Sequence, residues 1–185
     1  MRVPTLRLIG AVAAFALSPF PVFGQEADPK PGIGRESEPF LIHVKTSLGI
    51  DDAQICVVPN VAWAALEAGH QVTILFDGSA VTSVAKGFGW RGWLGLKTTA
   101  MDRAPLPERE RRSLAEQFGV PVESVPEDYG AYLRFLKQKG IPLYYNRTMA
   151  LLYGIDPEDV DPALTAMGLK EMVQLLSSPS VYLVY

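Results

Sequence analysis

The sequence contains a single cysteine, Cys56, among 185 residues. One cysteine cannot form a disulfide within its own chain, which excludes a disulfide-stabilised fold. A free thiol is buried, paired with another chain or used chemically, and free cysteines are most often buried. The sequence also lacks a run of basic residues, since 17 basic residues stand against 20 acidic ones and give a net charge of −3. Nucleic acid is therefore not an expected partner.

No apolar run in the sequence is long enough for a stable membrane span, which takes about 20 residues. The main apolar stretch, residues 8–17, follows Arg2 and Arg7. A basic start, a short apolar run and a small residue at Gly24 are typical of a cleavable secretory signal. We expect residues 1–24 to be removed and the mature protein to be periplasmic or secreted from a bacterium, with no membrane contact afterwards. An uncleaved anchor is the alternative.

The rest of the chain divides into a leader and one domain. Residues 25–38 are rich in proline, glycine and charge, which is typical of a flexible segment. Residues 39–185 have the length and apolar content of a single domain. Four short apolar runs bounded by turn residues predict buried strands, at 40–45, 71–76, 141–145 and 181–185. Because helical patterns separate these runs, we expect an α/β fold with a mainly parallel sheet covered on both faces.

Local signals predict where the helices begin. Asp51 or Asp52 can cap the first helix, and Pro59 inside it predicts a kink or a broken first turn. Ser124 and Glu127 form a capping-box pattern before the next clear helix. Asp161, followed by proline, predicts the start of the last helix, whose buried face would hold Leu164, Met167, Leu169, Met172, Val173 and Leu176. Further helices are expected at 79–86 and 107–118, and a short helix or a turn at 146–153.

In a parallel α/β sheet, ligands bind beyond the carboxyl ends of the strands. Topology alone therefore predicts a ligand-binding site from the residues that follow the strands, which are Thr46, Ser47, Asp77, Gly78, Tyr145 and Asn146. The Asp77-Gly78 pair is also a common turn, and Asn146-Arg147-Thr148 matches a glycosylation acceptor, which we discount in a bacterial protein.

Two stretches resemble the DsrE/DsrF-like family. Residues 60–78 combine a small-residue helix, Ala-Gly-His, an apolar strand and Asp-Gly, and residues 132–185 repeat the family's order of helices and strands. The resemblance implies a three-layer α/β/α domain with a parallel sheet of about five strands, and oligomers, often trimers or hexamers. It covers about residues 40–80 and 130–185, whereas residues 87–125 match less well. That stretch includes Trp90 and Trp93, which would belong either to a surface that binds a partner or to the core.

The best-understood members of that family carry sulfur on a cysteine just after the third strand. In this sequence the corresponding positions are Asn146 and Met149, neither of which is a thiol. Since sulfur carriage needs a thiolate, that chemistry is not expected there. The resemblance adds Met149 to the candidate ligand-binding residues.

Cys56 is the one candidate catalytic residue. A thiol early in a helix can have a lowered pKa, but Cys56 also lies in an apolar run, where it would be a core residue. His43 lies inside the first strand and is expected to be a hydrogen-bonded core residue, and His70 to link a helix to a strand. No zinc, phosphate-loop, dinucleotide or Ser/His/Asp signature is present, so no cofactor is expected.

Three functions remain open at this point. The preferred one is an exported, non-catalytic domain that binds a small ligand or a protein partner and self-assembles, with a link to sulfur metabolism. The second is a periplasmic sulfur-relay or thiol protein that uses Cys56. The third is a metal-binding protein that uses histidine and methionine.

Overall fold

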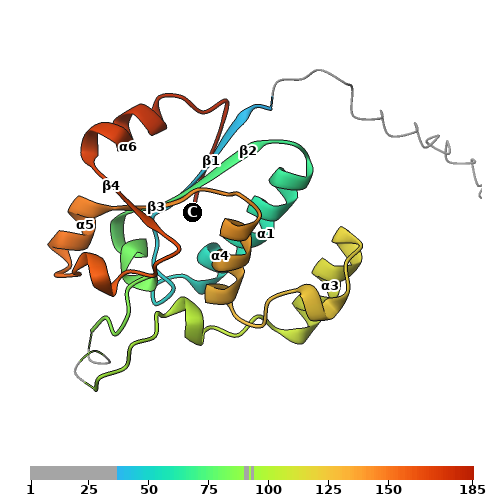
Figure 1. The fold of residues 1–185 in the computed structure, drawn as a ribbon, viewed down its shortest axis with the longest axis horizontal. Helices are drawn as coiled ribbons and strands as arrows, with labels where there is room; N and C mark the ends of the chain where they lie inside the picture. The colour runs from blue at the N-terminus through green and yellow to red at the C-terminus, as the bar shows by residue number, and fades with distance from the viewer. Residues whose placement is uncertain (1–36, 90–91, 93) are drawn as a thin grey trace, which may run out of the picture. The chain divides into compact units, whose positions relative to one another are not determined.

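The computed structural model describes residues 37–89, 92 and 94–185, and their strands form one sheet in the order β4-β3-β2-β1-β5 (Figure 1). All four strand pairings are parallel. The strands are β1 (Pro39–Val44), β2 (Gln71–Phe76), β3 (Leu143–Asn146), β4 (Thr165–Met167) and β5 (Val181–Val184). The predicted α/β class with a parallel sheet of about five strands is confirmed.

The helices connect the strands as a parallel sheet requires. They are α1 (Asp52–Glu67), α3 (Glu108–Phe118), α4 (Tyr129–Gln138), α5 (Arg147–Leu152) and α6 (Leu169–Leu176). Shorter 3₁₀ turns are η1 (Gly78–Ser83), η2 (Met101–Arg103), η3 (Val122–Ser124) and η4 (Pro157–Asp159). The α-helix predicted at 79–86 is wrong, because the chain forms only the η1 turn there. Trp90 and Trp93 lie outside the described residues.

One face of the sheet packs against α1 and α4. Alternate residues of the central strands, including Ile42 and Ile74, point into this core and are fully buried. The largest side chain there is Trp63 of α1, which stacks on Phe118 of α3 with ring centroids 4.0 Å apart. Truncating such a buried aromatic typically costs about 3–5 kcal/mol of stability. This core therefore holds α1 and α4 in place beside the ends of the strands.

The opposite face of the sheet is covered mainly by α6. Its small core contains Leu41, Leu75 and Met167, with Met172, Leu175 and Leu176 packed against them. Tyr182 and Val184 of the edge strand β5 remain 46% and 52% exposed. Parallel sheets are normally buried on both faces. This face is therefore less completely covered within one chain than the α1–α4 face.

Helix α1 differs from the prediction in one respect. Of the two predicted caps, Asp51 and Asp52, Asp51 is the N-cap. Its side chain accepts a hydrogen bond from the backbone N–H of Gln54. The helix then continues without a break from Asp52 to Glu67 through Pro59, which is buried in its interior. The expected broken turn is wrong, because packing of this face against the sheet outweighs the one backbone hydrogen bond that proline removes.

The predicted capping box is also wrong. The hydroxyl of Ser124 donates to the carbonyl oxygen of Pro121 inside the η3 turn. Asp128 instead caps α4, because its carboxylate accepts a hydrogen bond from the N–H of Ala131 at 2.6 Å. A carboxylate at the N-cap accepts this bond and also meets the positive end of the helix dipole.

The last helix begins later than its sequence signal predicts. Asp161 accepts hydrogen bonds from the N–H of Ala163 and from Arg134, both at 2.8 Å, so its side chain closes a turn and does not cap a helix. The chain then forms β4, and α6 starts at Leu169. The predicted buried face is therefore wrong in part: Leu164 and Met167 precede the helix, and Leu169 and Val173 are exposed.

Candidate functional site

A group of hydrogen-bonded polar side chains lies where β1, β2 and β3 end. The carboxylate of Asp77 lies 3.0 Å from Nε2 of His43 and accepts a hydrogen bond from Nδ2 of Asn146 at 2.7 Å. The other ring nitrogen of His43, Nδ1, lies 2.6 Å from the hydroxyl of Tyr182. His43 is only 3% exposed, so its expected role as a hydrogen-bonded core residue is confirmed. We call these four residues the strand-end cluster.

The strand-end cluster keeps Asp77 ionised. The hydrogen bond from His43 is the largest cause that lowers the pKa of Asp77, to about 2, with help from the N–H of Gly78 and from Asn146 and against the effect of burial. An ionised carboxylate can only accept hydrogen bonds. Nε2 of His43 therefore carries a proton, and in the neutral ring Nδ1 accepts the hydroxyl proton of Tyr182.

Asn146, one of the two positions at which the sequence resemblance leads us to expect a cysteine, has a structural role. Its Oδ1 accepts hydrogen bonds from the N–H groups of Thr148 and Met149 at 2.9 and 3.2 Å, which makes it the N-cap of α5. Its Nδ2 donates to Asp77 and also lies 3.4 Å from the sulfur of Met172. Because its polar atoms are engaged and it is 4% exposed, Asn146 is also closed to glycosylation.

The other predicted strand-end residues do not join this cluster through their side chains. The N–H of Ser47 donates to the hydroxyl of Ser79, and the N–H of Thr46 to the carbonyl oxygen of Tyr185. Tyr145 points to the opposite face of the sheet from Asn146, where it is buried. Met149 packs against the larger core. Of the residues predicted from topology, the structure thus brings the side chains of Asp77 and Asn146 together but not those of Thr46, Ser47 and Tyr145. Met149, which the family resemblance added, also lies outside the cluster.

Gly78 has a steric reason to be glycine. Its φ is +52°, and a Cβ added to it would lie 3.0 Å from the carbonyl oxygen of Lys45. A side chain would therefore be disfavoured both by the backbone conformation and by the close approach of the chain. Gly78 shapes the turn after β2 and donates its N–H to Asp77.

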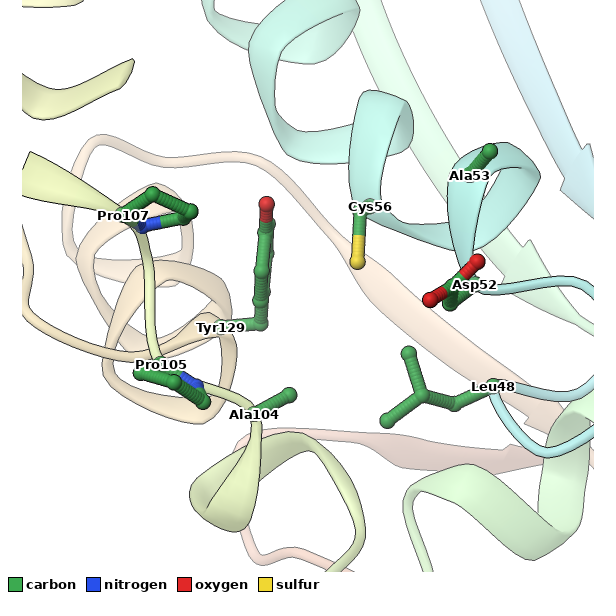
Figure 2. Close-up of a pocket in the computed structure, with 8 residues that line it drawn as sticks. All are labelled: Leu48, Asp52, Ala53, Cys56, Ala104, Pro105, Pro107 and Tyr129. Carbon is green, nitrogen blue, oxygen red and sulfur yellow. The ribbon is translucent and has the colours of Figure 1, made fainter. Parts of the chain in front are cut away.

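A separate cavity of about 510 Å³ lies beside Cys56 (Figure 2). The start of α1, the loop after β1, the segment after η2 and the start of α4 form its walls. The residues that line it are Leu48, Asp52, Ala53, Cys56, Ala104, Pro105, Pro107 and Tyr129. Most of these side chains are apolar, and Cys56 is the only one predicted as a site residue. We call this space the Cys56 cavity.

The Cys56 thiol is half-buried and protonated at neutral pH. Burial is the main cause that raises its pKa, and the hydrogen bond with the Tyr129 hydroxyl opposes it. The negative charges of Asp52 and Glu110 raise the pKa further by smaller amounts. A reactive cysteine needs the opposite environment, with positive charge nearby. Cys56 lies in the second turn of α1, where the helix dipole favours the thiolate. Burial and the nearby negative charges outweigh this effect, so the pKa is raised.

Tyr129 forms the inner wall of the cavity and belongs to a buried polar group. Its hydroxyl donates to Oε2 of Glu110 at 3.0 Å, and Nδ2 of Asn60 donates to Oε1 of Glu110 at 2.7 Å. Burial raises the pKa of Tyr129 well above its ordinary value. The phenol therefore stays neutral, and both oxygens of Glu110 are occupied by donors from the protein.

Few features of the sequence predict this cavity. Its walls come from segments that are far apart in the chain, and Pro105 and Pro107 lie within residues 87–125, which match the family pattern less well. Tyr129 is a buried residue of α4, together with Tyr132 and Leu133, and it also forms part of the cavity wall. Only the position of Cys56 near a strand end and a helix start was a usable signal.

Three other observations bear on the expected chemistry. His70 packs its ring against Phe40 of β1, with ring centroids 5.3 Å apart. No three histidine, cysteine, aspartate or glutamate side chains of the described residues come together as metal ligands. In the same part of the chain, no helix is both long and apolar enough to cross a membrane.

Comparison with known proteins shows likeness at the level of fold. No protein-family model matches the chain, and no curated protein matches its sequence. Among solved structures, a protein of unknown function from Methanobacterium thermoautotrophicum, MTH1491, has a TM-score of 0.52 at 8% identity, over 80% of this chain and 100% of that one. The YchN protein of E. coli has a TM-score of 0.50 at 13% identity, and the match covers 80% of this chain and 99% of that protein. Both have DsrE/DsrF-like folds.

Proposed function

We propose that this chain, which has a DsrE/DsrF-like fold, is an exported, non-catalytic protein that binds a small molecule in the Cys56 cavity and self-assembles. The observation that carries the proposal is the cavity itself: about 510 Å³, with mainly apolar walls. Ligand sites are typically concave and apolar, with a few polar groups that orient the ligand. The cavity meets that description, and Asp52 and Tyr129 supply the polar groups.

The thiol chemistry supports a binding role over a catalytic one. The two positions that correspond to the family's cysteine are Asn146 and Met149, and the first of them is committed to capping α5. The remaining thiol, Cys56, has a raised pKa. A protonated thiol is a poor nucleophile, so Cys56 serves as cavity wall.

Export is proposed from the pattern of residues 1–24. A bacterial host that expresses the full chain should release a protein whose first residue is Gln25, because Gly24 provides the small residue that signal peptidases require. N-terminal sequencing of the protein in a periplasmic extract tests this. A protein that keeps Met1 and stays with the membrane fraction would contradict export.

Self-assembly is proposed from the face of the sheet that α6 covers. Tyr182 and Val184 on β5 are exposed there, and so are Leu169 and Val173 on α6. Burying this apolar surface against other copies would complete the cover that a parallel sheet normally has. By family resemblance, we expect trimers or hexamers.

Ligand binding is tested with a neutral fluorescent probe, 1-aminoanthracene, on the mature protein. The wild-type chain should increase the probe's fluorescence with saturation. Ala53→Trp, which places a large side chain at the cavity wall, should abolish the increase. Ala64→Trp is the matched control, because Ala64 is an exposed alanine of the same helix that does not line the cavity. Equal binding of 1-aminoanthracene by the two variants would contradict the proposal, and so would the absence of binding by the wild-type chain.

The alternative is a thiol protein that uses Cys56, and the half-exposed thiol on the cavity wall is the observation in its favour. It requires a persulfide on Cys56 after exposure to inorganic polysulfide, which transfers one sulfur atom to the thiolate and leaves as a polysulfide shorter by one sulfur. Mass spectrometry detects the product as the added mass of one sulfur atom. It also requires that Cys56→Ser abolish activity, whereas a binding protein keeps its ligand affinity in that variant.

A further inference from the structure

The Cys56 cavity has an unpaired carboxylate on one side and an aromatic ring on the other. Figure 2 shows Asp52 and Tyr129 on opposite sides of the space with the Cys56 side chain between them, and the Tyr129 ring is seen edge-on so that one ring face is turned toward Cys56 and Asp52. Asp52 is exposed in the first turn of α1 and has no hydrogen bond or ion pair within the part of the chain that the structure describes. Because Asp52 lies in the first turn of α1, the helix dipole stabilises its negative charge. The helix dipole does not explain why an aromatic ring lies on the opposite side of the cavity.

The charged side chains at and directly behind the cavity wall are acidic. Asp52 lines it, and Glu110 lies behind Tyr129. Both charges reach Cys56, because both raise the pKa of its thiol. None of the lining residues is lysine, arginine or histidine. An anionic ligand would be repelled from such a site.

The rest of the cavity wall is apolar. Leu48, Ala104 and Pro105 offer methyl and methylene groups near the space between Asp52 and Tyr129 (Figure 2). Such a wall does not suit a hard metal ion, which takes several oxygen ligands, because only one carboxylate lines the cavity. An organic cation fits all three features, since its alkyl groups contact the apolar wall and its charge is attracted to a carboxylate and an aromatic face.

We propose that the Cys56 cavity binds a small organic cation of the alkylammonium class, with the charged nitrogen between the Asp52 carboxylate and the Tyr129 ring. This inference rests on the proposed binding function and specifies its ligand class. It gives Asp52 the role of the charge partner and Tyr129 that of the aromatic wall, and the alkyl groups lie against Leu48 and Pro105.

The test compares choline with its uncharged isostere 3,3-dimethylbutan-1-ol by calorimetry on the mature protein. Choline should bind at least about tenfold more tightly, because the two molecules differ mainly in charge. Asp52→Asn should weaken choline binding about tenfold and leave the isostere unchanged. Glu123→Gln, which changes an exposed acid that does not line the cavity, should leave both unchanged.

The outcomes separate this inference from the proposed function. Equal affinities for choline and the isostere, or choline binding that is unchanged in Asp52→Asn, would overturn the cation inference and leave the cavity as a neutral-ligand site. Binding of 1-aminoanthracene without binding of choline would do the same. Failure of all three probes to bind would overturn the proposed function as well.

Discussion

The carboxylate of Asp77 lies 3.0 Å from Nε2 of His43, and this contact joins the ends of β1 and β2 on the face that α6 covers. The pair is nearly closed to solvent, with side chains 15% and 4% exposed. Asn146 and Tyr182 extend it to β3 and β5. A single hydrogen-bonded group thus ties together four of the five strands of the sheet.

The pKa of Asp77 predicts how stability depends on pH. The folded-state pKa is about 2, below the unfolded value of about 3.9. The stabilisation is therefore fully present above about pH 4 and is lost as the pH falls toward about 2. Asp77→Asn should cost about 1–2 kcal/mol at neutral pH and flatten this acid-side loss in urea unfolding curves. Asp156→Asn, an exposed control, should behave like the wild type.

A prediction for Cys56 follows from its raised pKa. Iodoacetamide at about pH 8 should alkylate Cys56 in the folded protein at least about tenfold more slowly than in the urea-unfolded chain, because little thiolate is present. Mass spectrometry of the intact chain measures the rate, and only one site can react since the sequence has one cysteine. Rapid alkylation at about pH 7 would contradict the account and favour the thiol protein.

Arg134 should matter for stability because of the buried acid it holds. Its Nη1 donates to Asp102 and to Asp161, both at 2.8 Å, and the Asp161 side chain is only 4% exposed. Arg134→Met should cost about 2 kcal/mol or more, since Asp161 would keep a poorly compensated charge. The control is Arg112→Met, which breaks an exposed pair with Glu108 and should cost under about 1 kcal/mol. Similar losses in both variants would contradict this role.

Self-assembly should depend on the exposed apolar side of α6. Val173, which is 62% exposed, would become buried in the proposed oligomer. Val173→Glu should shift the protein toward monomer, because it places a charge in an apolar interface. Gln174→Glu adds the same charge at the neighbouring exposed position and should leave assembly intact. Sedimentation velocity distinguishes the outcomes, and a wild-type monomer would remove the proposal.

The sequence predicted the fold well where local patterns coincide with tertiary packing. The apolar runs at 40–45, 71–76 and 181–185 correspond to strands within one residue of the observed bounds. It missed β4 because Thr165–Met167 is too short to show a period, and because Asp161-Pro162 is a strong helix-start signal. Tertiary pairing with β3 outweighs that signal.

The candidate site was less predictable for a different reason. Asp77 and Asn146 could be paired from topology, because both follow neighbouring parallel strands. The Cys56 cavity could not be derived in this way, because Pro105 and Tyr129 approach Cys56 only through the packing of α4 and the segment after η2 beside α1. The direction of the Cys56 pKa shift depends mainly on burial of the thiol, which results from tertiary packing and has no signature in the sequence.

The most direct test of the central claim uses Cys56 as a reporter inside the cavity. The alkylation rate of Cys56 is measured by intact-protein mass spectrometry while 1-aminoanthracene is titrated into the mature protein. A probe seated against Cys56 should suppress alkylation at least about tenfold, with the same midpoint as its fluorescence increase. A probe that binds with full fluorescence while Cys56 alkylates at an unchanged rate would place the ligand elsewhere and contradict the account.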